Sequence, residues 1–161
     1  FCVIHSGISR KLSQGKYNER KQETEMASKI LKVPSLRHAT IDQLHLIEDE
    51  IVQKRAKHII TENIRVQNSV ILLKNNNALE FGKLMNQSHL SMDLDYEISS
   101  LELNKVVKEA RQAGALGARL TGAGFGGCVV ILAENSKINE IQNIVIENCP
   151  NSFWVTNISN S

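Results

Sequence analysis

The chain has 161 residues, with 19 Lys and Arg against 17 Asp and Glu, and 42% of its residues are hydrophobic. This length is typical of one domain and suffices for a hydrophobic core without disulfides or metals. The ordinary apolar fraction and the near balance of charge exclude an intrinsically disordered chain. Residues 1–74 are basic and residues 75–161 acidic, but without a dense Lys/Arg run this pattern does not favour nucleic-acid binding.

The three cysteines, Cys2, Cys128 and Cys149, lie in or beside apolar segments. Their odd number and the absence of a close Cys/His spacing predict buried free thiols in a reducing cytoplasm, without a zinc site. The apolar runs are far shorter than the roughly 20 residues that cross a bilayer, so we expect no membrane span. The opening Phe-Cys-Val-Ile-His is typical of the middle of a strand, and we therefore expect a fragment of a longer, cytoplasmic protein.

Helical periodicity dominates the first two thirds of the chain. It predicts helices over residues 17–32, 49–74, 78–93, 100–113 and 136–148, with a short element after Thr40 or Asp42 and a turn at the asparagines 75–77. The long helix over 49–74 lacks Gly and Pro, which favours one unbroken element. Its amphipathic stripe consists of Ile51, Ile59, Val66, Val70 and Leu73.

Short β-prone runs stand at both ends of the chain and in its middle. They predict strands over residues 1–5, 118–121, 128–132 and 153–158. Strands in these places with helices between them indicate an α+β fold. We expect about four mostly antiparallel strands covered by several helices on one face.

The segment from Gly114 to Gly127 is the strongest functional signal, with six glycines in fourteen positions. A two-residue hairpin turn needs only one or two glycines, so this density favours contact with a ligand over a plain turn. Glycine backbone without Cβ atoms lets N–H groups form a concave nest for phosphate. The segment is neither a Walker A loop nor a dinucleotide fingerprint, because no Gly-Lys-Ser/Thr follows and no acidic residue stands at the required distance.

The string GARLTGAGFGGCVVIL, residues 117–132, closely resembles the third signature motif of the GHMP kinases, in its galactokinase form in particular. Three further stretches are similar to that family in the same order: KYNERKQE at 16–23, HIITENIRVQNSVILL at 58–73 and FGKLMNQSHLSMDLDYEISSLEL at 81–103. The resemblance covers nearly the whole chain. It implies the C-terminal domain of a galactokinase, spanning residues 1–161 with a ferredoxin-like sheet.

The family's activity is the transfer of the ATP γ-phosphoryl group, with Mg²⁺, to the C1 hydroxyl of galactose in a cleft between two domains. Its amino-terminal sugar-binding signature, Ser-rich phosphate loop and catalytic Asp have no counterpart here, so we expect no catalytic residue, no metal ligand and no activity from this chain alone. The resemblance implies that the Tyr17 hydroxyl lies against the sugar. It also implies that a loop lines the cleft near the transferred phosphate, formed by Gly122, Ala123, Gly124, Phe125, Gly126 and Gly127.

Some positions depart from the family pattern, namely Lys16, Lys21, Leu101 and Asn104. None removes a motif residue, but they leave the sugar open. The alternatives are a kinase for N-acetylgalactosamine or another GHMP substrate, and a galactose/ATP sensor that binds a transcriptional regulator. The sequence indicates no oligomeric state.

Other polar residues favour structural roles. Arg20 is expected in a surface ion pair with Glu19 or Glu23, and Arg119 is expected to steady its surroundings. The helix faces His58/Glu62/Arg65 and His89/Asp93/Glu97 lack a second histidine or a nucleophile, so neither predicts metal or acid–base chemistry. Cys128 enters an apolar strand and is expected to be buried and inert.

Overall fold

The computed structural model describes residues 1–9 and 13–158. Its elements in chain order are β1 (Cys2–His5), α1 (Ser13–Ile30), the 3-10 helices η1 (Leu36–His38) and η2 (Ile41–Leu46), α2 (Glu50–Lys74), α3 (Ala78–Leu94), α4 (Leu101–Gln112), β2 (Gly117–Thr121), β3 (Cys128–Leu132), the 3-10 helix η3 (Asn135–Lys137), α5 (Ile138–Asn148) and β4 (Phe153–Asn157). The expected α+β fold is confirmed, and every expected helix and strand is present. The main difference lies in α1, which begins before Tyr17.

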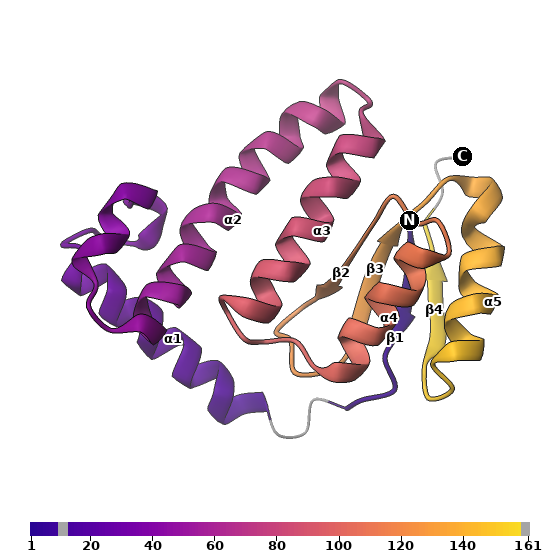
Figure 1. Ribbon diagram of the computed structural model, residues 1–161, viewed down its shortest axis with the longest axis horizontal. Helices are drawn as coiled ribbons and strands as arrows, with labels where there is room; N and C mark the ends of the chain where they lie inside the picture. Colours follow the sequence, from indigo (N-terminus) through magenta and orange to yellow (C-terminus); the bar gives the residue numbers. More distant parts are fainter. Residues whose placement is uncertain (10–12, 159–161) are drawn as a thin grey trace.

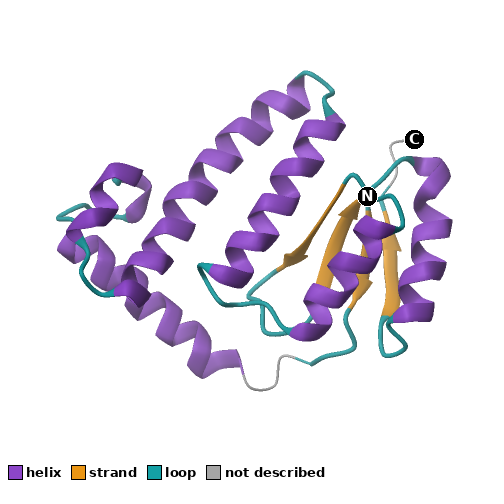
Figure 2. Ribbon diagram, viewed as in Figure 1, coloured by secondary structure: helices purple, strands orange, loops and turns teal. Residues whose placement is uncertain are grey.

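The four strands form one sheet in the order β2-β3-β1-β4, and every neighbouring pair is antiparallel. This order, with one helix before β2 and another between β3 and β4, is the ferredoxin-like arrangement. The helices α1, α2 and α3 form an insertion between β1 and α4, and Figures 1 and 2 show α2 and α3 as a pair beside the sheet. The first and last strands of the chain, β1 and β4, are neighbours in the sheet.

The main core lies between one face of the sheet and the helices α4 and α5. Alternate strand residues supply the sheet side: Cys2, Ile4, Ala118, Leu120, Val129 and Ile131. Leu103, Val106, Val107 and Ala110 supply the α4 side, at the spacing that puts them on one helix face. These positions are almost completely shielded from solvent, so the sheet and α4 form one packed unit.

Cys128 does not share this core. Its neighbour Val129 points into the core, so Cys128 faces the opposite side of the sheet and is half-buried. The expectation that Cys128 is buried was therefore wrong. Cys2 and Cys149 are buried free thiols, and burial raises the pKa of Cys2 to about 11.

Helix α3 covers the edge strand β2. The Asn86 side chain accepts a hydrogen bond from the Ala118 N–H over 3.0 Å, and the His89 Nδ1 accepts one from the Leu120 N–H over 3.3 Å. These side chains bind edge groups that have no further strand as a partner, which removes an exposed pairing edge. Because Nδ1 of His89 is an acceptor, its Nε2 donates to Asn104 over 3.1 Å. Both ring nitrogens therefore form hydrogen bonds within the domain.

A second, smaller core joins α1, η1, η2 and the first half of α2. Of the amphipathic stripe expected on α2, only Ile59 packs against this core, because Ile51, Val66, Val70 and Leu73 are each about half exposed. The buried positions are instead Val52, Arg55, Ala56, His58 and Ile60. The expected packing face of α2 was thus wrong except at Ile59, since α2 turns a different side toward α1 and α3. Within the described residues, no helix has the length and apolar character needed to cross a membrane.

Candidate functional site

The glycine segment forms the connection between β2 and β3, and it is tightly folded rather than a simple hairpin. Phe125 and the four glycines 122, 124, 126 and 127 all have positive φ angles. A Cβ atom on Gly124 would lie 2.3 Å from the Ile98 carbonyl oxygen, and one on Gly126 would lie 2.7 Å from the Ile8 carbonyl oxygen. Both distances are far below van der Waals contact, so the loop needs glycine at these two positions because neighbouring backbone is too close.

Backbone hydrogen bonds hold the loop on both sides. The N–H of Phe125 donates to the Ile98 oxygen over 2.7 Å, and the N–H of Gly127 donates to the Ile8 oxygen over 3.0 Å. The phosphate nest inferred from the glycines is therefore smaller than the motif, because two of its N–H groups are already used inside the protein. Gly122 and Ala123 are exposed, and their N–H groups have no partner within the described residues. They are the part of the loop open to an anion.

The beginning of helix α1 lies beside this loop. The Lys16 ammonium group is 5.2 Å from the centre of the Phe125 ring, a cation–π contact. Tyr17 is the next residue and is 55% exposed, so its ring is available to a ligand. The structure thus places the start of α1 beside the loop 122–127 through Lys16, which adds a positive charge, and Tyr17 follows Lys16 in the chain. That Tyr17 meets a sugar and that the loop meets a phosphate stay predictions. Figure 1 shows the start of α1 and the β2–β3 connection at the same end of the molecule.

A buried ion network lies next to Tyr17 on α1. Arg20, one turn further on, is only 8% exposed and pairs with Glu19 and Glu23, as expected, and more distantly with Glu97. The pairing was predicted, but its place at the surface was wrong, because α1 turns Arg20 toward the interior.

Arg55 is the centre of that network. Burial alone would lower the pKa of its guanidinium group, but hydrogen bonds and charges from Glu97 and Glu23 outweigh this effect and raise it. The same hydrogen bond lowers the pKa of Glu97. Arg55 and Glu97 are therefore both charged at neutral pH.

The other polar residues considered from the sequence have structural partners. Glu62 binds Arg65 at 2.7 Å, Arg119 at 2.8 Å and the Ser88 hydroxyl at 2.6 Å. Burial would raise the pKa of Glu62, but these partners lower it. His58 is buried and stacks on Tyr96, with 4.5 Å between ring centres. No group of three or more His, Cys, Asp or Glu side chains in the described part of the chain is arranged to hold a metal ion.

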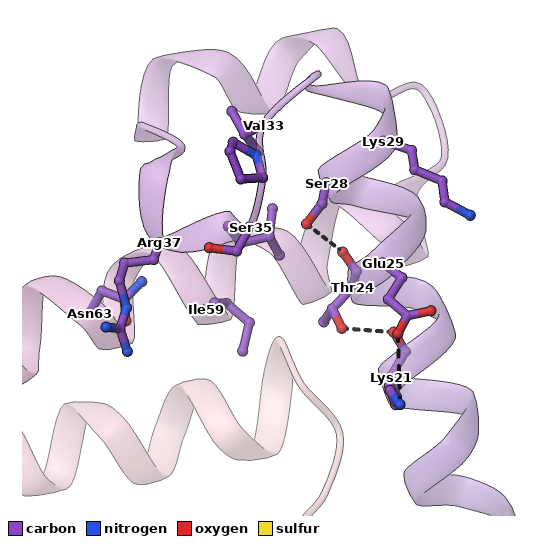
Figure 3. A pocket seen from close by; sticks show the side chains of 12 residues that line it. Lys21, Thr24, Glu25, Ser28, Lys29, Val33, Ser35, Arg37, Ile59 and Asn63 are labelled. Atoms are coloured by element: carbon purple, nitrogen blue, oxygen red, sulfur yellow. Dashed lines mark hydrogen bonds and ion pairs between the residues drawn. The ribbon is translucent and has the colours of Figure 1, made fainter.

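A cavity of about 580 Å³ lies elsewhere, between α1, η1 and α2. Figure 3 shows its polar wall, with Lys21 paired to Glu25 and the Ser28 hydroxyl bonded to the Thr24 carbonyl. No residue that the sequence pointed to as a ligand contact lines this cavity. Neither Tyr17 nor the glycine loop lines it.

The sequence reasoning missed Arg55 and Ile98. It considered Glu97 only on a helix face with His89 and Asp93, whereas α3 ends at Leu94 and Glu97 lies in the segment that follows. One signal was available for Arg55, because a charged residue stands between Val52, Ala56 and Ile59 at the spacing of a buried helix face. A charge within such a face indicates a buried ion pair. Nothing local in the sequence marks Ile98, whose role depends on its carbonyl oxygen.

Comparison with known proteins is consistent with this geometry. The family model described as GHMP kinases C terminal matches residues 69–151. A galactokinase of Staphylococcus carnosus is 37% identical over 149 residues, covering 87% of this chain and 38% of the relative. A galactokinase of Fusobacterium nucleatum is 40% identical over 153 residues, covering 88% of this chain and 39% of the relative. The chain spans about two fifths of the length of these relatives.

Solved structures show the same fold. The crystal structure of Lactococcus lactis galactokinase complexed with galactose is similar with a TM-score of 0.89 and 34% identity, covering 95% of this chain and 43% of that one. The crystal structure of L. major mevalonate kinase in complex with R-mevalonate has a TM-score of 0.63 at 21% identity, covering 94% of this chain and 40% of that one, which shows a shared fold. The ferredoxin-like sheet, the glycine loop and the matched family model lead to one conclusion: the chain belongs to the GHMP kinases, as their C-terminal domain.

Proposed function

We propose that the chain is the carboxy-terminal part of a cytoplasmic galactokinase, which transfers the γ-phosphoryl group of ATP to the C1 hydroxyl of galactose. The observation that carries the proposal is the contact between Phe125 of the glycine loop and Lys16, the residue that precedes Tyr17 on α1. The curated relatives named galactokinase, and the similar structure that contains galactose, support this choice of substrate.

In this proposal, the chain contributes one wall of a cleft. Tyr17 presents its hydroxyl to the sugar, and the loop 122–127 lies near the transferred phosphate, with Gly122 and Ala123 offering N–H groups to it. The Lys16 ammonium group adds positive charge where the phosphates would gather. Phosphoryl transfer depends mainly on positioning and on stabilisation of charge, so these parts help catalysis without forming a complete catalyst.

The catalytic Asp and the Ser-rich phosphate loop belong to an amino-terminal domain outside these residues. With ATP bound, Mg²⁺ would supply positive charge that offsets the charge of the phosphates. The exposed N–H groups of the loop suit phosphate oxygens, whereas the described residues offer no cluster of metal ligands. We therefore assign phosphate contacts to Gly122 and Ala123.

An assay of ADP release by the full-length parent tests the proposal, with galactose, N-acetylgalactosamine, mevalonate and homoserine offered separately. We expect turnover with galactose, and a KM for galactose raised about tenfold by Tyr17→Phe, which removes one hydrogen bond to the sugar. The matched control is Tyr96→Phe, because Tyr96 is the other tyrosine and its ring packs on His58. We expect this control to keep the wild-type KM.

Turnover with another substrate alone would replace galactose in the proposal. Retained galactose and ATP binding without any turnover would indicate a sensor. The isolated 161 residues are expected to release no ADP, and measurable galactose phosphorylation by them would contradict the assignment of catalysis to the other domain.

A further inference from the structure

The two parts of the proposed site come from segments more than a hundred residues apart. Lys16 and Tyr17 stand on α1, whereas the glycine loop follows β2. Enzymatic phosphoryl transfer is sensitive to displacements of about 1 Å, so the distance between these parts must be fixed by tertiary contacts. The cation–π contact of Lys16 is exposed and weak, and it does not fix that distance by itself.

A two-residue segment between α3 and α4, Glu97–Ile98, contacts both parts. The Ile98 carbonyl accepts the Phe125 N–H over 2.7 Å and leaves no room for a side chain at position 124. The Glu97 carboxylate forms ion pairs with Arg20 of α1 at 3.8 Å and with Arg55 of α2 at 2.8 Å. The glycine loop and α1 are therefore joined through adjacent residues of the same segment.

Glu97 also has a φ angle of +53°, which is unusual for a residue with a Cβ atom. Such a conformation persists only where surrounding contacts hold it. Arg55 supplies two of these contacts, because it is bound to the Glu97 side chain and to the carbonyl oxygen of Asp95, two residues earlier. A backbone bond from the Ile98 N–H to the Met92 carbonyl oxygen, over 3.0 Å, supplies a third.

Arg55 reaches all of these groups from the middle of α2. Its Nε donates to Glu23 of α1 over 2.9 Å, its Nη1 to the Asp95 carbonyl over 2.8 Å and its Nη2 to Glu97 over 2.8 Å. Its side chain is only 2% exposed, so water does not replace these bonds. A guanidinium group is planar with donors in a fixed fork, and a lysine ammonium cannot form the same three bonds in these directions.

We infer that Arg55 is a positioning residue, which holds the Tyr17 helix and the glycine loop in register by joining Glu23 of α1 to the Glu97–Ile98 segment. The inference rests on the proposed function and deepens it. Arg55 touches neither sugar nor phosphate in this arrangement. It determines the positions of Tyr17 and the glycine loop, which make those contacts in the proposed function.

The test is a double-mutant cycle in the full-length parent with Arg55→Lys and Tyr17→Phe. If Arg55 acts through the position of Tyr17, the two losses overlap. We expect Arg55→Lys to lower kcat/KM for galactose about 20-fold and Tyr17→Phe to lower it about 10-fold. We expect kcat/KM of the double variant to lie within about threefold of that of the less active single variant. Losses that multiply to about 200-fold would mean that Arg55 acts independently of Tyr17, and would overturn the inference.

Arg65→Lys is the matched control, because Arg65 lies on the same helix and its bonds to Glu62 and Thr61 stay within α2. We expect it to change kcat/KM less than twofold. An equal loss in Arg65→Lys and Arg55→Lys would indicate a general effect of altering α2, and would also overturn the inference.

Glu97→Gln provides a variant that is expected to fold, since the Glu97 side chain is 47% exposed. Hydrogen exchange of the parent measures positioning directly, because the Phe125 amide is protected by Ile98. We expect both Arg55→Lys and Glu97→Gln to speed exchange of the Phe125 amide at least tenfold, while Arg65→Lys leaves it unchanged.

Unchanged exchange in Arg55→Lys and Glu97→Gln would overturn the inference. A parent that does not phosphorylate galactose would overturn the proposed function alone. In that case the exchange rates would still decide whether Arg55 holds the loop.

Discussion

The backbone N–H of Phe125 donates a hydrogen bond to the carbonyl oxygen of Ile98 over 2.7 Å, and this bond fixes the glycine loop on the segment between α3 and α4. The same carbonyl lies where a side chain at position 124 would begin. The loop is therefore shaped by contact with backbone elsewhere in the domain as much as by its own sequence.

Replacing Gly124 by alanine should destabilise the domain by about 3 kcal/mol or more, because it adds a clash with Ile98 to the strain of φ +81°. Gly114→Ala separates the two effects, since position 114 has φ +100° but open space around it. It should cost about 1–2 kcal/mol. Chemical denaturation of each variant measures the free energy of unfolding. Equal losses would show that the contact with Ile98 does not matter.

Two glycines inside helices should respond to alanine in opposite directions. Gly15 in α1 has open space, so Gly15→Ala should stabilise the domain by about 0.5–1 kcal/mol through helix propensity. Gly82 in α3 crosses Gly117 of β2, and its Cβ would lie 2.4 Å from the Leu116 oxygen. Gly82→Ala should therefore destabilise by about 2–3 kcal/mol despite the same gain in propensity. Thermal unfolding of the pair checks the sign, and a stabilised Gly82→Ala would contradict the close approach of α3 and β2.

His58 should make stability depend on pH. Burial lowers its pKa from 6.5 to about 4. The smaller effects of nearby charges oppose one another, because Glu62 and Asp95 raise this pKa whereas Arg65 and Arg119 lower it. As pH falls below 6.5, the unfolded chain binds a proton that the folded chain does not, so stability falls between pH 6.5 and 4 by about 3 kcal/mol in total. Urea unfolding at several pH values in this range measures the free energy of unfolding, which should depend less steeply on pH in His58→Phe than in the wild type. An identical pH dependence would mean that His58 takes up its proton in the folded domain as readily as in the unfolded chain.

The positive charge beside the loop should matter for nucleotide binding. In the full-length parent, Lys16→Met should raise the KM for ATP about threefold to tenfold, because it removes an ammonium group from the proposed phosphate side of the cleft. Lys16→Arg should restore most of the affinity by keeping the charge. Lys21→Met is the control on the same helix, since Lys21 pairs with Glu25 away from the loop. A Lys16→Met KM equal to that of the control would remove Lys16 from the site.

Most of the fold could be predicted from local patterns. The helices, the strands and the connection at residues 122–127 follow from periodicity, turn residues and glycine spacing, which act over a few neighbouring residues. The packing face of α2 could not be predicted in this way. Its stripe from Ile51 to Leu73 has helical spacing but is largely exposed, because burial depends on which side of α2 meets α1 and α3.

The sequence by itself determined the fold class, the membership of the GHMP kinases and the two segments of the proposed site, Tyr17 and the glycine loop. The reason is that these properties depend on short motifs and on the order of those motifs along the chain. Only the tertiary structure decided which N–H groups of the loop remain free, and that Arg55 joins α1 to Glu97. These features require contacts between residues tens of positions apart, such as Ile98 with Phe125, and no local pattern specifies such contacts.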